Sequence, residues 1–263
     1  LLSIALPLAG ESDELVLARM LTDLPGRDNS DRLRELTRRL AQRRDQLRAD
    51  GANARIAAFS SAHPAVDLSK LATQQDAAVL LVDGARELLE GRVALAGELL
   101  DQAPCDVAFA ISRGEPSSGE AILVPFGGSQ DDWAALELAG RLAKRLRAPL
   151  VLAGSESLGN EGDASRLLAT ASLILQRLVG VTAEPRLITP GADGVLGAAS
   201  DARLIVVGLS PRYRTEGLGE TRHAIAKRAA APSLFVRRGT RPGLLAPPSS
   251  LTRFRWSAVA SRG

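Results

Sequence analysis

Three segments in the first half of this sequence recur in the same order in its second half, and such a repeat restricts the folds that the chain can adopt. The matching pairs are "IALPLAGESDE" (Ile4–Glu14) with "ILVPFGGSQDD" (Ile122–Asp132), "DAAVLLVDG" (Asp76–Gly84) with "DARLIVVGL" (Asp201–Leu209), and "APCDVAFAISRG" (Ala103–Gly114) with "APSLFVRRG" (Ala231–Gly239). The repeat predicts a duplicated module, each copy about the size of a small domain.

The second half alternates apolar strand-like runs with helical segments. Ser129 is a candidate N-cap for a helix that has acidic residues in its first turn and basic residues in its last. The expected strands are "AILVPF", "PLVLAG", "RLITPG", "RLIVVG" and "SLFVRR". Strands that alternate with helices favour a parallel sheet covered on both faces. We therefore predict an α/β protein of two tandem open parallel-sheet, Rossmann-like modules.

The first half follows the same pattern with one gap. A strand is expected at 4–10, a helix near 11–24 and a second helix near 31–49, with only "PGRDNS" between the two helices. The second half has the strand "PLVLAG" at the equivalent point. Either the first module has lost that strand, or residues are missing from this version of the chain.

The predicted domain organisation follows from the repeat and from a polar Pro/Gly/Ser stretch between its copies. Residues 1–114 form a degenerate first module, 115–120 a linker, 121–240 the second module, and 241–263 a basic tail. The tail ends in "LTRFRWSAVASRG", which could lie on a membrane surface, dock on a partner or pack back on the domain.

Composition argues against several classes of function. The net charge is only +3, so we expect no nucleic-acid binding. One cysteine and two histidines leave little for metal chemistry, and no nucleophile–base pair is recognisable. No apolar run is long enough to span a bilayer. The opening "LLSIALPLAG" lacks a signal peptide's basic region, and without an initiating Met the chain is expected to be an excised part of a longer protein. We expect no catalytic residues and no metal site.

A candidate anion-binding loop lies between the strand that ends at Gly208 and the helix that follows it, "GLSPRYRTEGLGE". Arg212 and Arg214 could clamp phosphates, because guanidinium groups match phosphate oxygens. An exposed basic loop is the interpretation that we favour. Tyr213 could stack on a base or cover the apolar underside of the loop.

The layout of the chain up to about Gly239 resembles that of the universal stress protein family, arranged as two tandem modules. This resemblance implies a nucleotide-binding type of sheet, with the ligand crevice at the carboxyl ends of the first and fourth strands. Members that bind ATP carry an Asp at the end of the first strand and a loop written G-x-x-G, about nine residues, then G-[S/T].

The chain departs from that family pattern at most positions. The strand-end Asp corresponds to Ala9 in the first half and to Gly127 in the second. Gly208 matches the first loop glycine, whereas Pro211 replaces the second and Glu220 the hydroxyl residue. A carboxylate at a helix N-terminus competes with a phosphate for the helix dipole, so ordinary ATP binding is not expected. The candidate ligand-binding residues are Gly127, Gly128, Gly208, Ser210, Arg212, Gly217, Gly219 and Thr221.

The segment "RRGTRPGLLAPPSSLTRFRWSAVA" is similar to the end of tandem stress-protein modules fused behind the membrane part of bacterial cation/proton antiporters. We therefore expect a non-catalytic cytoplasmic regulatory module, positioned at the inner face of a membrane as part of a transporter polypeptide and forming a homodimer through a sheet edge. Two alternatives stay open: a free-standing stress protein that binds an adenine nucleotide through a modified loop, and a scaffold with both crevices closed.

Overall fold

The structure is a computed structural model that describes residues 1–10, 13–22, 28–84, 88–89, 93–112, 119–155, 161–210 and 212–245. Within these ranges, the side chains of residues 93–96, 161–162 and 214 are not described. Pro211, most of the predicted linker 115–120 and most of the predicted tail 241–263 lie outside the described residues.

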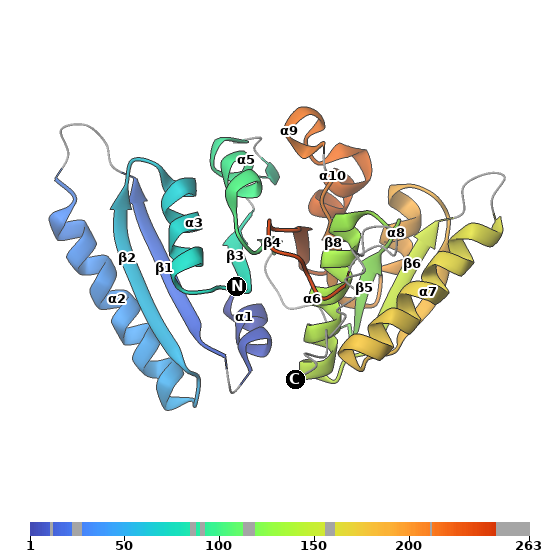
Figure 1. The fold of residues 1–263 in the computed structure, drawn as a ribbon, viewed down its shortest axis with the longest axis horizontal. Helices are drawn as coiled ribbons and strands as arrows, with labels where there is room; N and C mark the ends of the chain where they lie inside the picture. The colour runs from blue at the N-terminus through green and yellow to red at the C-terminus, as the bar shows by residue number, and fades with distance from the viewer. Residues whose placement is uncertain are drawn as a thin grey trace, which may run out of the picture.

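Strands and helices alternate in both halves of the chain (Figure 1). The first half contains α1 (Leu2–Ala9), β1 (Leu15–Thr22), α2 (Ser30–Ala49), β2 (Ala54–Ser61), α3 (Pro64–Gln74), β3 (Val79–Asp83), α5 (Val93–Gln102) and β4 (Asp106–Ile111). The second half contains β5 (Ala121–Pro125), α6 (Gln130–Leu146), β6 (Leu150–Ser155), α7 (Glu161–Val179), β7 (Ala183–Ile188), α8 (Ala192–Ala198), β8 (Ala202–Gly208), α9 (Tyr213–Glu216), α10 (Gly219–Arg228) and β9 (Ser233–Arg237).

The described strands form two sheets. Seven strands follow the order β3-β4-β9-β8-β5-β6-β7, and β1 pairs with β2 in a separate two-stranded sheet. All pairs are parallel except β4 with β9, which run antiparallel and join the two halves through their sheet edges. The predicted α/β class with parallel sheets is confirmed.

The buried side chains of β5 show how the large sheet separates two hydrophobic cores. Ile122 and Val124 belong to the core under α6 and α7, whereas Leu123 belongs to the core that Ile225 of α10 also joins. Successive strand side chains point to opposite faces, so β5 contributes to both cores. Both faces of the sheet are therefore covered by helices.

The expected start of the first half is wrong. Residues 4–10 were expected to be a strand, but α1 spans Leu2–Ala9, with Ile4 and Leu8 packed on the core under α6. Their spacing of four residues places both side chains on one helix face. The helix expected near 11–24 is also wrong, because β1 forms a parallel pair with β2 over eight residues. Tertiary pairing here overrides the local sequence preference.

The strand β1 is the first-half counterpart of β6. Leu15–Ala18 and Leu150–Ala153 have the same sequence, "LVLA", and each is the first part of a strand paired in parallel with the next strand along the chain. The sequence match of Ile4–Glu14 with Ile122–Asp132 is therefore wrong as a structural equivalence, because the first segment contains most of helix α1 and the second contains most of strand β5. The strand "PLVLAG" has a counterpart after all, and β5 is the strand without one in the described first half.

Candidate functional site

The predicted crevice lies where β5 and β8 end, and the first turn of α6 forms one of its walls. Ser129 caps α6: its hydroxyl accepts a hydrogen bond from the backbone N–H of Asp132 at 3.2 Å. In return, Asp132 Oδ2 accepts from the backbone N–H of Ser129 at 3.0 Å and from that of Gly127 at 3.1 Å. This reciprocal capping box confirms Ser129 as the N-cap. Two N–H groups that could face an anion here, those of Gly127 and Ser129, are bonded to a carboxylate of the chain itself.

Gly208, at the end of β8, lies against the same helix start. A methyl group on its Cα would lie 2.6 Å from the carbonyl carbon of Asp131 and 2.6 Å from the backbone nitrogen of Asp132. The carbonyl oxygen of Gly208 accepts a hydrogen bond from Arg222 Nε of α10 at 2.6 Å. The glycine at this position therefore allows two backbone segments to approach each other, and its immediate surroundings are filled by protein atoms.

The loop after β8 folds on itself. Ser210 Oγ accepts from the backbone N–H of Arg212 at 3.1 Å, and Arg212 forms an exposed ion pair with Glu216 at 3.0 Å. Tyr213 is only 4% exposed and belongs to a hydrophobic core, so it covers the underside of the loop. The ring of Tyr213 is thus not presented for stacking on a base.

The remaining predicted residues lie at turns. Gly128 (φ 86°) sits in the β5–α6 turn beside Leu167 of α7. Gly217 (φ 64°) and Gly219 (φ 71°) flank the junction of α9 and α10, with open space around each Cα, and Thr221 is half-buried in α10. The structure brings Gly127 and Gly208 together around Asp132, whereas Gly217 and Gly219 lie where α9 is followed by α10.

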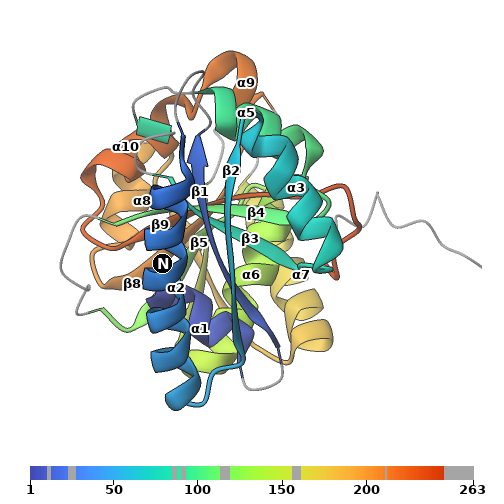
Figure 2. The ribbon, with the colours of Figure 1, turned by 90° about the vertical axis from the view of Figure 1, so that its left-hand side faces the viewer.

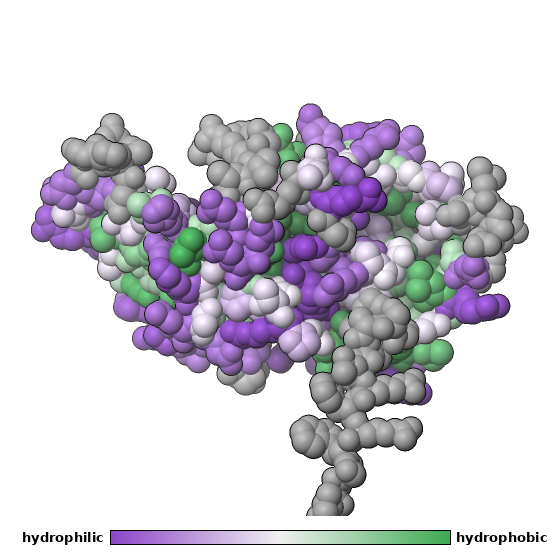
Figure 3. Space-filling model, turned by 45° about the horizontal axis from the view of Figure 1, so that its top comes forward, coloured by the Kyte–Doolittle hydropathy of each residue, from purple (hydrophilic) through white to green (hydrophobic). Residues whose placement is uncertain are grey.

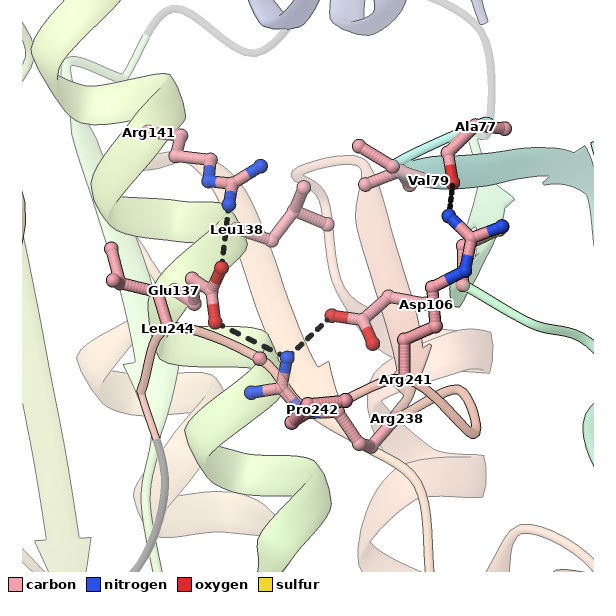
Figure 4. A pocket seen from close by; sticks show the side chains of 13 residues that line it. Ala77, Val79, Asp106, Glu137, Leu138, Arg141, Arg238, Arg241, Pro242 and Leu244 are labelled. Carbon is pink, nitrogen blue, oxygen red and sulfur yellow. Dashed lines mark hydrogen bonds and ion pairs between the residues drawn. The ribbon is translucent and has the colours of Figure 1, made fainter. Parts of the chain in front are cut away.

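A second polar site, which the sequence reasoning missed, lies where the two halves meet (Figure 4). Arg238, just after β9, is 7% exposed, and its Nη1 atom donates to Asp106 of β4 at 2.8 Å and to Glu137 of α6 at 3.2 Å. Its Nη2 atom donates to the carbonyl oxygen of Leu245 at 2.8 Å. Glu137 also accepts from Arg141 at 2.6 Å, so one buried guanidinium holds acidic groups from both halves.

Asp131 extends this ionic contact to the wall of the crevice. Its carboxylate pairs with Arg237 at 2.6 Å and accepts from the backbone N–H of Arg238 at 2.9 Å. Burial raises the pKa of Asp131, and the bonds from Arg238 and Arg237 oppose this rise. Burial likewise raises the pKa of Asp106, against the charge of Arg238.

These groups border a cavity of about 160 Å³ between β3, β4, α6 and the segment after β9. Arg241 spans one side of it, pairing with Asp76 at 2.6 Å. The sequence carried a signal for this site, because Asp106 interrupts the apolar run "PCDVAFAI" and an Arg pair ends β9. Charged residues at buried strand ends require partners.

In the part of the chain that the structure describes, no group of three or more His, Cys, Asp or Glu residues could hold a metal ion. Among the same described residues, no helix combines the length and the apolar character needed to cross a membrane.

Comparisons with known proteins support the fold. No protein-family model and no curated protein matches the chain. A universal stress protein from Archaeoglobus fulgidus DSM 4304 is similar in structure, with 16% identity, 86% of each chain covered and a TM-score of 0.61. The cytoplasmic domain of a prokaryotic cation chloride cotransporter is also similar, with 14% identity, 86% of this chain and 84% of the other covered, and a TM-score of 0.60.

A functionally unknown protein from Pseudomonas aeruginosa PAO1 matches at 16% identity over 84% of this chain and 82% of its own, with a TM-score of 0.53. At these identities the likeness concerns the fold alone. The chain thus has the fold of universal stress proteins, a fold that a transporter's cytoplasmic domain shares.

Proposed function

We propose that this chain is a non-catalytic regulatory module, located in the cytoplasm as part of a secondary transporter of the cation/proton antiporter kind. The observation that carries the proposal is the Asp132 carboxylate at the crevice between β5 and β8. Asp132 Oδ2 accepts hydrogen bonds from the N–H groups of Gly127 and Ser129. Gly208 packs against the first turn of α6, the helix that contains Asp132. A negative group at this position disfavours a bound phosphate.

The ionic contact between the two halves fits a regulatory role. Arg238 binds Asp106 of one half and Glu137 of the other with almost no exposure to water. Removal of one partner from such a buried cluster leaves an uncompensated charge, so the halves are held in one arrangement. A partner that contacts one half would therefore also act on the other.

The likeness to a cotransporter's cytoplasmic domain over 86% of the chain supports the attachment to a transporter. A homodimer through a remaining sheet edge belongs to the same proposal. The test is ion flux in membrane vesicles that contain the intact polypeptide or a version truncated before this module. We expect truncation to change the dependence of flux on ion concentration or pH while transport persists. Identical flux curves would contradict the regulatory role.

The competing function is adenine-nucleotide binding by a free-standing stress protein. Gly217 and Gly219, with positive φ and open space, are the features that favour it. Calorimetry with ATP and AMP separates the two functions. We expect no heat of binding at millimolar nucleotide, and saturable binding that Gly219→Val removes would establish the alternative.

A further inference from the structure

The cavity between β3, β4, α6 and the segment after β9 is lined by residues of both halves. The first half contributes Ala77, Val79 and Asp106, and the second half contributes Leu138 and residues 241–244, among others. Figure 1 and Figure 2 both show β3 and β4 close to α6. On the face that Figure 3 shows, hydrophobic residues lie scattered between hydrophilic ones among the residues drawn in colour. A recess that combines charged and apolar groups is therefore a more specific candidate for a binding site than that face.

The volume of the cavity restricts the ligand to a small molecule. The cavity measures about 160 Å³, whereas pockets for drug-sized ligands measure about 300–1,000 Å³. A cavity of about 150 Å³ can hold benzene. Alanine is similar in size to benzene, so a molecule of that kind fits the cavity, and an adenine nucleotide is too large for it.

The charged groups around the cavity differ in burial. The side chains of Arg238 and Glu137 are buried, and that of Asp106 is nearly so. Two carboxylates therefore contact the single buried guanidinium. Arg141 and Arg241 are about half-exposed and lie at the rim. Figure 4 shows them on opposite sides of the cavity, with the carboxylate of Asp106 between them.

The carboxylate of Asp106 has capacity for a further hydrogen bond. Its Oδ2 atom accepts from Arg238 Nη1 at 2.8 Å, and its Oδ1 atom accepts from the backbone N–H of Gly239 at 3.0 Å. An ionised carboxylate can accept about four hydrogen bonds. Burial raises the pKa of Asp106, although the charge of Arg238 opposes this rise. A second positive group beside Asp106 would therefore stabilise its ionised form.

The two guanidinium groups at the rim have donors to spare within the described part of the chain. Arg241 donates through Nη1, to Asp76 at 2.6 Å and to the carbonyl oxygen of Ala77 at 3.4 Å. Arg141 donates through Nη2, to Glu137 at 2.6 Å. A guanidinium has five N–H donors in a planar fork that matches a carboxylate. The rim therefore suits a negative group, and the interior suits a positive one.

We propose that this cavity binds a small α-amino acid as a zwitterion, with its ammonium group on Asp106 and its carboxylate on Arg241. A lone anion would be repelled by the carboxylates of the cavity and a lone cation by its guanidinium groups, whereas a zwitterion pairs with both. Leu138 and Leu244 also line the cavity and would contact an aliphatic side chain. This site is independent of the proposed attachment to a transporter, because its test measures binding and not transport.

The segment that follows Leu245 does not supply the same groups. Residues 246–263 contain three Arg and no Asp or Glu. Their side chains therefore offer no anion to Arg241, and a free ligand has to provide the carboxylate.

Titration calorimetry of the full wild-type chain with four probes tests the charges that the ligand needs. The probes are L-alanine, L-valine, propionate, which lacks the ammonium group of alanine, and ethylamine, which lacks its carboxylate. We expect at least one of the amino acids to bind at one site per chain with a Kd of about 1 mM or lower. Propionate and ethylamine should bind about tenfold more weakly or worse, because each loses a charge-assisted hydrogen bond.

The variant Arg241→Gln tests the location of the site. It removes the charge that holds the ligand carboxylate and should weaken binding of the amino acid by about tenfold or more. The ion pair of Arg241 with Asp76 is exposed, so this variant should keep the Tm of the wild type. The matched control is Asp76→Asn, which removes a competing carboxylate and keeps Arg241, so binding should be unchanged or tighter.

Four results would overturn the proposal. The first is no saturable binding of either amino acid. The second and third are binding of propionate, or of ethylamine, as tight as that of the amino acid, which would show a plain anion or cation site. The fourth is undiminished binding by the Arg241→Gln variant, which would place the amino acid elsewhere on the chain.

Discussion

Replacement of Gly208 by alanine tests whether the crevice is closed. The new methyl carbon would lie 2.6 Å from backbone atoms of both Asp131 and Asp132, and still closer to a carboxylate oxygen of Asp132. Unstrained carbon–nitrogen contacts need well over 3 Å, so the first turn of α6 must move. Overpacking of this kind costs roughly 1–3 kcal/mol, and we expect about 2 kcal/mol. For a chain of this size that loss lowers Tm by about 4–8 °C.

The matched control is Gly197→Ala in α8, where the same methyl group meets no atom within 4 Å. Alanine is the better helix former, so this variant should melt at or slightly above the wild-type temperature. Thermal unfolding followed by far-UV circular dichroism compares the three proteins. If Gly208→Ala melts within about 1 °C of the wild type, Gly208 faces open space, and the argument for a closed crevice fails.

Three further outcomes follow from the described contacts. Arg238→Met should cost about 3–5 kcal/mol, because Asp106 loses its cation and the buried Glu137 keeps only its pair with Arg141. Arg212→Ala, at an exposed pair, should leave Tm nearly unchanged, and similar losses for both variants would contradict the buried cluster. Ser129→Ala should destabilise by about 1 kcal/mol in thermal or urea unfolding, and no change would argue against the cap of α6. Burial raises the pKa of Cys105 to about 11, so its thiol should react with Ellman's reagent at pH 8 only after unfolding; full reaction of the native protein within minutes would show that this strand end opens.

The second half could be predicted from the sequence because its signals are local. The capping box at Ser129 and the apolar run of β5 each lie within one element, and the structure contains both. The duplicated α/β architecture was also predictable, since the matches at Asp76–Gly84 and Ala103–Gly114 fall on true counterparts.

The beginning of the chain could not be predicted in the same way. Residues 4–10 and 15–22 are both rich in Leu and Ala, so periodicity over such short runs does not separate helix from strand. Packing of Ile4 and Leu8 on the second half and pairing of β1 with β2 decide between them, and both are long-range contacts.

The role of Gly208 could not be decided from the sequence for a related reason. A glycine at the end of a strand is consistent with a phosphate loop and also with close approach of two backbones, and only the position of α6 distinguishes the two cases. The first half favours close approach of two backbones as the reason for this glycine. The residue there that is equivalent to Gly208 is Asp83, and no counterpart of the α6 N-terminus is described in that half. The contact of Arg238 with Asp106 joins residues 132 positions apart, which no local pattern reveals.

The most direct test of the proposed function is the size and location of the polypeptide that carries this chain in its own cells. An antibody raised against residues 119–245 would be used on membrane and soluble fractions separated from a cell lysate. We predict a single band in the membrane fraction, well above the 27.6 kDa of this chain. A band of about that mass confined to the soluble fraction would contradict attachment to a transporter and favour the free-standing stress protein.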